Sequence, residues 1–227
     1  MGAGSAEERE RTEQPGSLRD AGILMPSIPW DIAARSQRER ILKALTKSCA
    51  DKTFASTTIA DIVSHASISR ATFYKHFSNK TECFHAATDS FVDELQGVAT
   101  EARATADGTK AEEVRTVIAA VLERLAAKPE HAKLLLIEAP HVDSQIVCGY
   151  RRRVLDALEA ELLEPESGGR AGADPEIAFG RAKVLVAEHI VAGDIERLPV
   201  LLPELVYIAL LPYVGQDTAL EQAQIAR

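Results

Sequence analysis

The 227-residue chain contains only three cysteines, Cys49, Cys83 and Cys148, and they lie far apart. A disulfide framework needs paired cysteines, and a structural zinc site needs closely spaced ligands. The spacing argues against both and favours a reducing, cytoplasmic compartment. The histidines and glutamates of the second half also form no spacing typical of a metal site. We therefore expect neither a metal nor a cofactor.

The sequence also lacks a long uninterrupted apolar run and a basic, apolar segment at its start. Its most apolar stretch, residues 198–214, contains Glu204 and three prolines. A membrane-spanning helix needs about 20 mostly apolar residues without such interruptions. This stretch therefore predicts a buried helix, with no membrane as a partner.

No catalytic constellation is evident, since neither a glycine-rich phosphate loop nor a nucleophile motif occurs. Glu-x-x-His appears at 82–85 and at 138–141, but Pro140 interrupts the second copy. A di-metal bundle would need both copies on helices that face two further glutamates. An all-α enzyme is therefore the least favoured hypothesis, and we assign no catalytic residue.

What the chain does have is an uneven distribution of charge, within a formal net charge of −8. Residues 35–80 contain nine basic and three acidic residues, a net charge of +6, whereas residues 81–227 carry a net charge of −11. A local basic segment on an acidic protein favours a polyanionic partner at that segment alone. A basic helical face exposed to solvent remains an alternative on composition alone.

Helical periodicity dominates the chain after residue 34, and strand-like alternation is absent from the sequence. Thr109 is placed to cap a helix that Pro129 ends, and glycines follow the two long apolar helices within 175–193 and 203–215. The glycines and prolines of residues 164–175 predict a loop. Weak periodicity and many glycines and prolines before residue 34 predict a flexible extension. The fold class is therefore all-α.

The segment from Thr58 to Phe77 has the spacing of two short helices joined by a tight turn. Thr57 or Thr58 can cap the first helix, and Ser69 can cap the second by accepting from the amide of Thr72. At about 100° per residue, Phe73 and Phe77 share the inner side of the second helix. The segment therefore predicts a helix-turn-helix.

The outer side of that second helix suits DNA. Ala71 allows close approach to bases, while Arg70 and Lys75 can reach guanine edges or phosphates. Hydroxyl groups and a helix N-terminus can bind phosphate oxygens. The predicted DNA-binding residues are Thr58, Ser69, Arg70, Ala71, Thr72, Tyr74, Lys75, His76 and Lys80.

The stretch TTIADIVSHASISRATFYKHFSNKTECF, residues 57–84, closely resembles the DNA-binding signature of the TetR family of bacterial transcriptional repressors. The resemblance covers the first domain only. In that family, the positions of Thr58, Thr72, Tyr74 and Lys80 bind phosphate. Ser67 departs from the pattern, which has glycine in the turn; a left-handed backbone would cost serine about 1–2 kcal/mol.

The resemblance implies a C-terminal helical domain, residues 85–227, that binds a small molecule and forms a homodimer. The surplus of apolar residues on the last two long helices agrees with a dimer through those helices, although a monomer with a wide core is an alternative. Residues on helices that the family uses around its pocket are candidate ligand contacts: Leu122, Leu136, Val147, Tyr150, Phe179 and Lys183.

Together these features predict a flexible extension (1–34), a helix-turn-helix domain (35–84) and a ligand-binding and dimerisation domain (85–227). The predicted function is a homodimeric, ligand-responsive regulator, a repressor, that binds a pseudo-palindromic operator in double-stranded DNA. A nucleoid-type protein that binds DNA without a ligand is the main alternative, and near sequence-independent binding would distinguish it.

Overall fold

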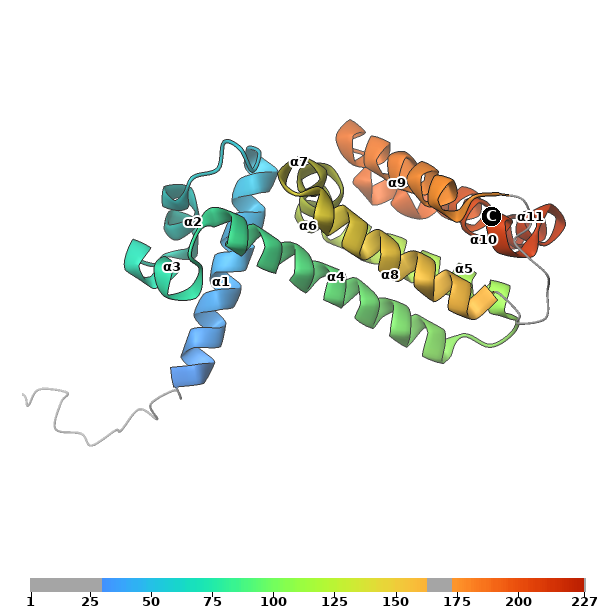
Figure 1. Cartoon of the computed structure of the whole chain (residues 1–227), viewed down its shortest axis with the longest axis horizontal. Coiled ribbons are helices and arrows are strands. Elements are labelled where there is room, and N and C mark those ends of the chain that lie inside the picture. Colours follow the sequence, from blue (N-terminus) through green and yellow to red (C-terminus); the bar gives the residue numbers. More distant parts are fainter. Residues whose placement is uncertain (1–29, 163–172, 227) are drawn as a thin grey trace, which may run out of the picture. The chain divides into compact units, whose positions relative to one another are not determined.

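The computed structural model describes residues 30–162 and 173–226, and all regular structure in these two ranges is helical (Figure 1). The predicted all-α class is therefore confirmed. Residues 1–36 and 37–227 form two separate units. The predicted loop at 164–175 and most of the predicted extension lie outside the described residues.

The first helix contains the predicted end of the extension. Helix α1 runs from Trp30 to Asp51, so the boundary expected at residue 34 falls inside a helix. The expected boundary after residue 84 likewise falls inside α4 (Lys80–Thr105), which is continuous. The DNA-binding region and the following body thus share a helix rather than a linker.

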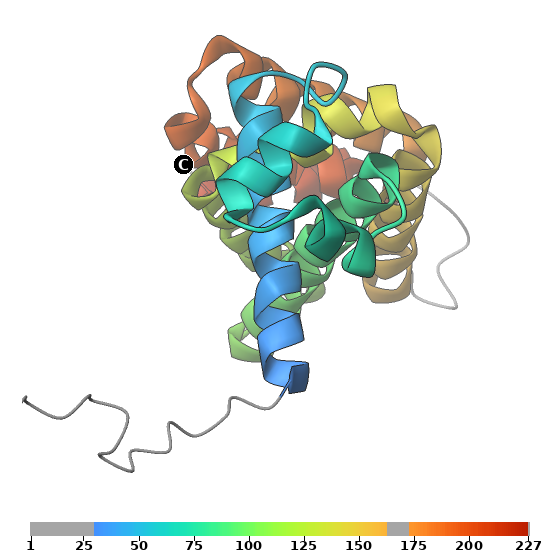
Figure 2. The ribbon, with the colours of Figure 1, turned by 90° about the vertical axis from the view of Figure 1, so that its left-hand side faces the viewer.

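Two short helices, α2 (Ile59–Ala66) and α3 (Arg70–His76), form the helix-turn-helix between α1 and α4. Their apolar sides pack with α1 and the start of α4 around three fully or almost fully buried phenylalanines, Phe73, Phe77 and Phe84. Ile41, Leu45 and Cys49 of α1 belong to the same cluster, as their helical spacing predicts. Figure 2 shows α2 and α3 together beside α1.

The body starts with α5 (Lys110–Ala127), α6 (Pro129–Lys133), a π-helical turn η1 (Leu134–Glu138), α7 (Ala139–Val142) and α8 (Ser144–Leu162). Thr109 caps α5 through a reciprocal bond with Glu112, as predicted from its position. Pro129 ends α5 and begins α6. The apolar run Leu134–Glu138 forms a π-helical turn rather than a regular α-helix.

The chain continues through α9 (Pro175–Ala192), the 3₁₀ helix η2 (Ile195–Leu201), α10 (Leu202–Val214) and α11 (Gln216–Ile225). Gly193 and Gly215 end α9 and α10 with positive φ values of 81° and 82°, which glycine adopts without strain. Helix α11, which packs against α10, is a feature that sequence periodicity missed.

One stretch, Ile195–Val214, is long and apolar enough to cross a membrane by length and composition. It is not a single straight α-helix, since it joins η2 to α10 and contains prolines within both elements. Leu198, Val206 and Leu210 are completely buried against the rest of the body. The stretch is therefore a core segment, in agreement with the sequence-based prediction.

Ser67 ends α2 in the left-handed conformation, with φ 52° and ψ 51°. It is the only non-glycine residue with positive φ among the described residues. The amide of Ile68 donates to the carbonyl of Val63 at 3.0 Å, which closes the helix end. Arg40 of α1 donates to the carbonyls of Ala66 and Ser67, so the strained turn is held from outside.

Replacing Ser67 with glycine should raise the free energy of unfolding by about 1 kcal/mol, because glycine removes the steric cost of the left-handed backbone. Denaturant unfolding of the full chain measures the change. Ser64→Gly is the matched control, because Ser64 is exposed and lies inside α2. There the same substitution should lower stability by about 0.5–1 kcal/mol, and equal signs for the two variants would contradict the interpretation.

Candidate DNA-binding interface

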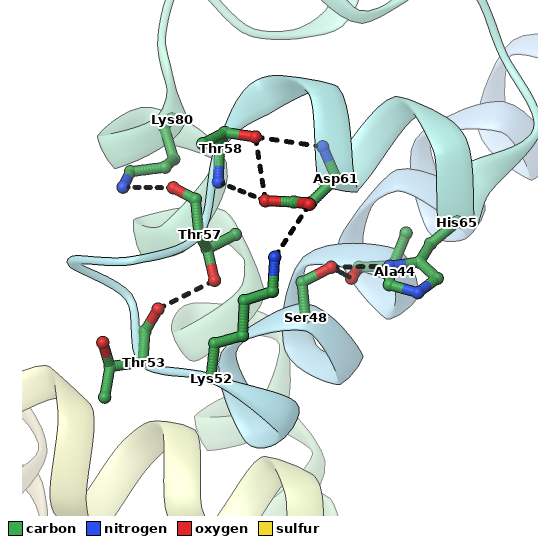
Figure 3. Close-up of polar contacts among 9 residues, drawn as sticks. All are labelled: Ala44, Ser48, Lys52, Thr53, Thr57, Thr58, Asp61, His65 and Lys80. Carbon is green, nitrogen blue, oxygen red and sulfur yellow. Dashed lines mark hydrogen bonds and ion pairs between the residues drawn. The ribbon is translucent and has the colours of Figure 1, made fainter.

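Helix α2 begins with a capping box formed by Thr58 and Asp61 (Figure 3). The hydroxyl of Thr58 accepts from the amide of Asp61 at 3.2 Å, and the Asp61 carboxylate accepts from the amide of Thr58 at 2.9 Å. Thr58 rather than Thr57 is therefore the cap. Thr57 is buried and donates its hydroxyl proton to the carbonyl of Thr53.

Asp61 is also tied to α1. Its carboxylate accepts from the Lys52 ammonium at 2.9 Å and from the Thr58 hydroxyl at 2.8 Å. Lys52 and the two Thr58 donors hold the pKa of Asp61 well below its usual range. The start of α2 thus carries a permanent negative charge, which the helix dipole favours there. Thr58 could donate to a phosphate only by giving up this carboxylate.

Helix α3 begins as predicted. The Ser69 hydroxyl accepts from the amide of Thr72 at 3.0 Å, and the two hydroxyl groups are 2.9 Å apart. Phe73 is completely buried and Phe77, the residue after α3, is almost completely buried. These two rings determine which side of α3 faces outward.

The outward side carries Arg70, Ala71, Tyr74 and Lys75, all of which are exposed. Tyr74 has 55% of its surface accessible, and its ring contacts the buried Phe73 ring edge-on at 5.5 Å. Among the described residues, neither Arg70 nor Lys75 has a hydrogen-bond or ion-pair partner. A helix only seven residues long thus presents two unpaired cations, a small residue and a phenol.

Thr72 and His76 lie at the edge of this surface and are half-buried. The His76 Nε2 atom is 3.3 Å from the Gln37 side-chain oxygen of α1. This contact connects α3 to α1 and leaves His76 less available than Lys75. DNA contact by either edge residue stays a prediction.

Fewer cations of the basic segment, residues 35–80, are available to DNA than its net charge indicates. Arg40 binds the turn carbonyls, Lys52 binds Asp61, and the Arg38 guanidinium lies 5.3 Å from the centre of the Phe77 ring. These cations stabilise the helix-turn-helix itself. Lys43 and Lys47 of α1, which the site prediction omitted, are exposed one helical turn apart.

Lys80 has an internal role that the sequence did not reveal. Its ammonium donates to the carbonyls of Phe54 at 2.6 Å and Thr57 at 2.7 Å, and it lies 4.1 Å from the centre of the Phe54 ring. Figure 3 shows the bond to Thr57. The loop between α1 and α2 is therefore bound to the start of α4. Only one N–H of Lys80 remains for the predicted phosphate contact.

The predicted ligand contacts mostly come together. Leu122 and Tyr150 are buried in one apolar cluster of the body, and Leu136, Val147 and Phe179 pack against it. Lys183 is half-buried and does not belong to this cluster. Sequence reasoning missed Phe91 and His131, whose rings are 5.2 Å apart in the same region. Burial, followed by the nearby Lys128, lowers the pKa of His131.

The hydroxyl group of Tyr150 is a buried polar group within that apolar cluster. Its side-chain oxygen is buried and has no hydrogen-bond partner among the described residues. Burial raises the pKa of Tyr150 to about 12, and its ring lies 6.1 Å from that of Phe179. An unpaired buried hydroxyl costs free energy, which a ligand with a hydrogen-bonding group would recover.

The cysteines do not form a redox pair in this structure. Cys49 and Cys83 are buried and free, and burial raises the pKa values of their thiols to about 11 and about 12. Such thiols react slowly because the thiolate is scarce. Within residues 30–162 and 173–226, no group of three or more His, Cys, Asp or Glu side chains is arranged to hold a metal ion.

The family of the helix-turn-helix segment is identified by its sequence. Residues 41–87 match the model for bacterial regulatory proteins of the tetR family. This range contains α2, α3 and most of the apolar cluster around Phe73. The predicted resemblance to the TetR family is confirmed. No curated protein matches the chain.

Solved structures extend the likeness to the body. A TetR-family transcription regulator from Marinobacter aquaeolei VT8 has a TM-score of 0.62 at 19% identity, over 86% of this chain and 97% of that one. SmeT, the repressor of the Stenotrophomonas maltophilia efflux pump SmeDEF, has a TM-score of 0.61 at 22% identity, over 80% and 92%. FadR from Bacillus subtilis, in complex with stearoyl-CoA, has a TM-score of 0.57 at 18% identity, over 78% of this chain and 98% of that one. At these identities the likeness shows the fold.

Replacing Lys80 with methionine separates its internal role from phosphate binding. We expect the free energy of unfolding to fall by about 1–3 kcal/mol, since two carbonyls lose a charged donor. Because the ammonium is already engaged, the dependence of DNA affinity on salt should stay unchanged. If Lys80 instead contacts one phosphate, the slope of log K against log salt should decrease in magnitude by about 0.9. Denaturant unfolding and DNA titrations at several salt concentrations measure both.

Proposed function

We propose that the chain is a homodimeric transcriptional regulator, a repressor, that binds a pseudo-palindromic operator and leaves it when a small molecule binds the body. The observation that carries the proposal is the outward side of α3, where Arg70 and Lys75 are exposed and have no partner among the described residues. The caps and core of the helix-turn-helix are complete without them. Their charges therefore serve no evident purpose in folding, while their placement suits a major groove.

The first turn of α3 would contact base edges, as in other helix-turn-helix proteins. Ala71 allows the backbone to approach, Arg70 and Lys75 reach guanine or phosphate, and Tyr74 donates to a phosphate oxygen. Lys43 and Lys47 on α1 can add phosphate contacts at the edge. The acidic remainder of the chain repels DNA elsewhere. We also propose that the protein is not an enzyme.

The homodimer is supported by an apolar stripe along α9. Ile177, Val184 and Val191 lie seven residues apart on one side of the helix and are 65%, 52% and 73% exposed. A shallow groove between α9 and α10 adjoins this stripe and contains Arg181 and Glu188. A second copy would cover the stripe and pair these charges, since a two-fold axis brings the same side to itself.

Helix α10 contributes less to this surface than its composition predicts. Leu201, Leu205, Val206, Ile208 and Leu210 are all buried within the chain itself. The apolar surplus expected on both long helices therefore lies mainly on α9, together with Val200 of η2, which is 67% exposed. We keep α9 and the adjoining edge of α10 as the proposed dimer interface.

The effector would occupy the apolar cluster around Tyr150 and Phe179. The side chains of this cluster favour a largely apolar molecule with one group that hydrogen-bonds to the Tyr150 hydroxyl. FadR from Bacillus subtilis, a protein of this fold, is in complex with stearoyl-CoA, a molecule with a long apolar acyl chain. For the chain to be released, the effector must bind the DNA-incompetent state more tightly, by roughly 1–3 kcal/mol.

Replacing Arg70 or Lys75 with alanine should weaken operator binding by about 1–3 kcal/mol each if the residue reads a base, and relax specificity at that base. The operator is first obtained by selecting genomic fragments that the protein retains. Affinity is then measured by fluorescence anisotropy at fixed salt. Arg152→Ala on α8, which removes an equal charge from an exposed site, is the control.

Unchanged operator affinity in both the Arg70 and Lys75 variants would overturn the assignment of α3. Selection that recovers no preferred sequence would support the nucleoid-type alternative, because a regulator should prefer its site by about 10³-fold or more.

Introducing a charge into the α9 stripe tests the dimer. Val184→Glu should weaken self-association by roughly 2–5 kcal/mol, because the carboxylate is desolvated against its own symmetry mate. Val184 is half-exposed in the single chain, so folding should be unaffected. Sedimentation velocity measures the oligomeric state. Val154→Glu on α8, at a valine that is 43% exposed, should leave the dimer intact; dimers that survive Val184→Glu unchanged would place the interface elsewhere.

A further inference from the structure

The π-helical turn η1 lies where the body meets the helix-turn-helix. Leu134 and Ala139, the residue after the turn, belong to the apolar cluster around Phe73 and Phe84. Leu135 and Leu136 instead belong to the cluster around Tyr150. The five-residue turn, together with the residue after it, thus contributes side chains to the apolar clusters of both regions. Such π-helical segments are rare and are frequently found at functional sites.

Two charged side chains of this region, Lys133 directly before η1 and Glu138 at its end, bind the last turn of α1 and the loop that follows it. Lys133, just before η1, donates its ammonium proton to the carbonyl of Ala50 at 2.6 Å. Glu138, the last residue of η1, accepts from the amide of Phe54 at 2.9 Å. Figure 1 shows α6 and α7 beside this end of α1.

Glu138 is only 8% exposed, which is unusual for a carboxylate. Burying a charge costs free energy unless strong hydrogen bonds compensate. The amide of Phe54 is one such partner, and the ammonium groups of Lys80 and Lys133 bind the carbonyls of Phe54 and Ala50. Glu138 therefore has a structural role that a polar residue exposed at the surface would not have.

Phe54 is held on every side by this arrangement. Its amide donates to Glu138, and its carbonyl accepts from Lys80. Its ring packs edge-on against the Phe84 ring, with the two ring centroids 4.7 Å apart. Lys80 also binds the carbonyl of Thr57, the residue that precedes the cap of α2. Besides the continuous helix α4 and the shared apolar cluster, Glu138 therefore connects the body to the loop that leads into the first helix of the DNA-binding motif.

We propose that the η1 turn is the coupling element between the body and the helix-turn-helix, and that Glu138 is its positioning residue. In the DNA-competent state, Glu138 holds the α1–α2 loop and Lys133 holds the last turn of α1, and together they fix the placement of α2 and α3. A rearrangement of the apolar cluster that turns η1 withdraws both side chains and releases the loop. This inference rests on the proposed function, because it names how the effector site would act on DNA binding.

Coupling is reciprocal, so DNA must act on η1 if η1 acts on DNA binding. The test is hydrogen–deuterium exchange of the full chain with and without the selected operator duplex, and with a duplex of equal length that lacks the operator. Operator DNA should slow exchange both in α2–α3 and at the amides of residues 134–139, far from the DNA-facing side of α3. The control duplex should leave residues 134–139 unchanged.

Variants at Glu138 complete the test. Glu138→Leu removes the acceptor at similar size; exchange of the Phe54 amide should become about tenfold faster or more, and operator affinity should fall by roughly 5- to 150-fold. Operator DNA should then no longer protect residues 134–139. Glu138→Gln keeps a weaker acceptor, so its exchange rate and operator affinity should lie between those of the leucine variant and the unaltered chain. It replaces the leucine variant if that variant does not fold. Glu123→Gln, at an exposed position on α5, is the control.

Each outcome separates this inference from the proposed function. Operator DNA that protects α2–α3 but not residues 134–139 in the unaltered chain would overturn the coupling and leave the regulator intact. The coupling is also overturned if folded Glu138 variants bind the operator as the Glu123 variant does. An absence of operator binding by the unaltered chain would overturn the proposed function itself.

Discussion

The arrangement of the DNA-binding region depends on how the loop between α1 and α2 is held. Lys80 binds two carbonyls of this loop and Glu138 binds one of its amides, so the start of α4 and the body meet at Phe54. Backbone groups that are partly buried must be paired, and this loop has no helix or strand to pair them. Side-chain charges from two other elements supply the partners. The position of α2, and with it that of α3, follows from these bonds.

The same use of charge explains why a basic segment occurs in an acidic protein. Arg38, Arg40, Lys52 and Lys80 are bound to rings, carbonyls or a carboxylate within the helix-turn-helix. Such cations cannot be counted fully as a footprint for DNA, although they raise the local potential that attracts it. Arg70 and Lys75 remain as the cations of α3 with no partner among the described residues, and they face away from the core. The net charge therefore indicates which segment attracts DNA, while the hydrogen bonds and ion pairs within that segment decide which of its cations are available to contact it.

Local signals predicted local structure well. Ser69 and Thr109 cap helices as their positions indicate, and Phe73 and Phe77 turn inward because helical geometry places them on one side. Ser67 adopts the left-handed conformation that its alignment with a family glycine suggested, because the turn needs that backbone whatever residue occupies it. Helix α1 begins at Trp30, although Pro26 and Pro29 made the segment up to residue 34 look irregular in the sequence. The π-helical turn and α11 were missed because apolar periodicity cannot separate π from α helix over five residues, and because α11 has little apolar contrast.

The sequence by itself determined the all-α class, the helix-turn-helix and its outward residues, because each depends on spacing within about 20 neighbouring positions. Tertiary structure alone decided the partners that come from distant segments. Glu138 meets Phe54 across 84 positions, Lys133 meets Ala50 across 83, and Lys80 is engaged by carbonyls 26 and 23 positions away. No periodicity records such pairs, because they depend on how whole helices pack. For that reason the sequence indicated only a phosphate contact for Lys80, and only an interrupted Glu-x-x-His spacing for Glu138.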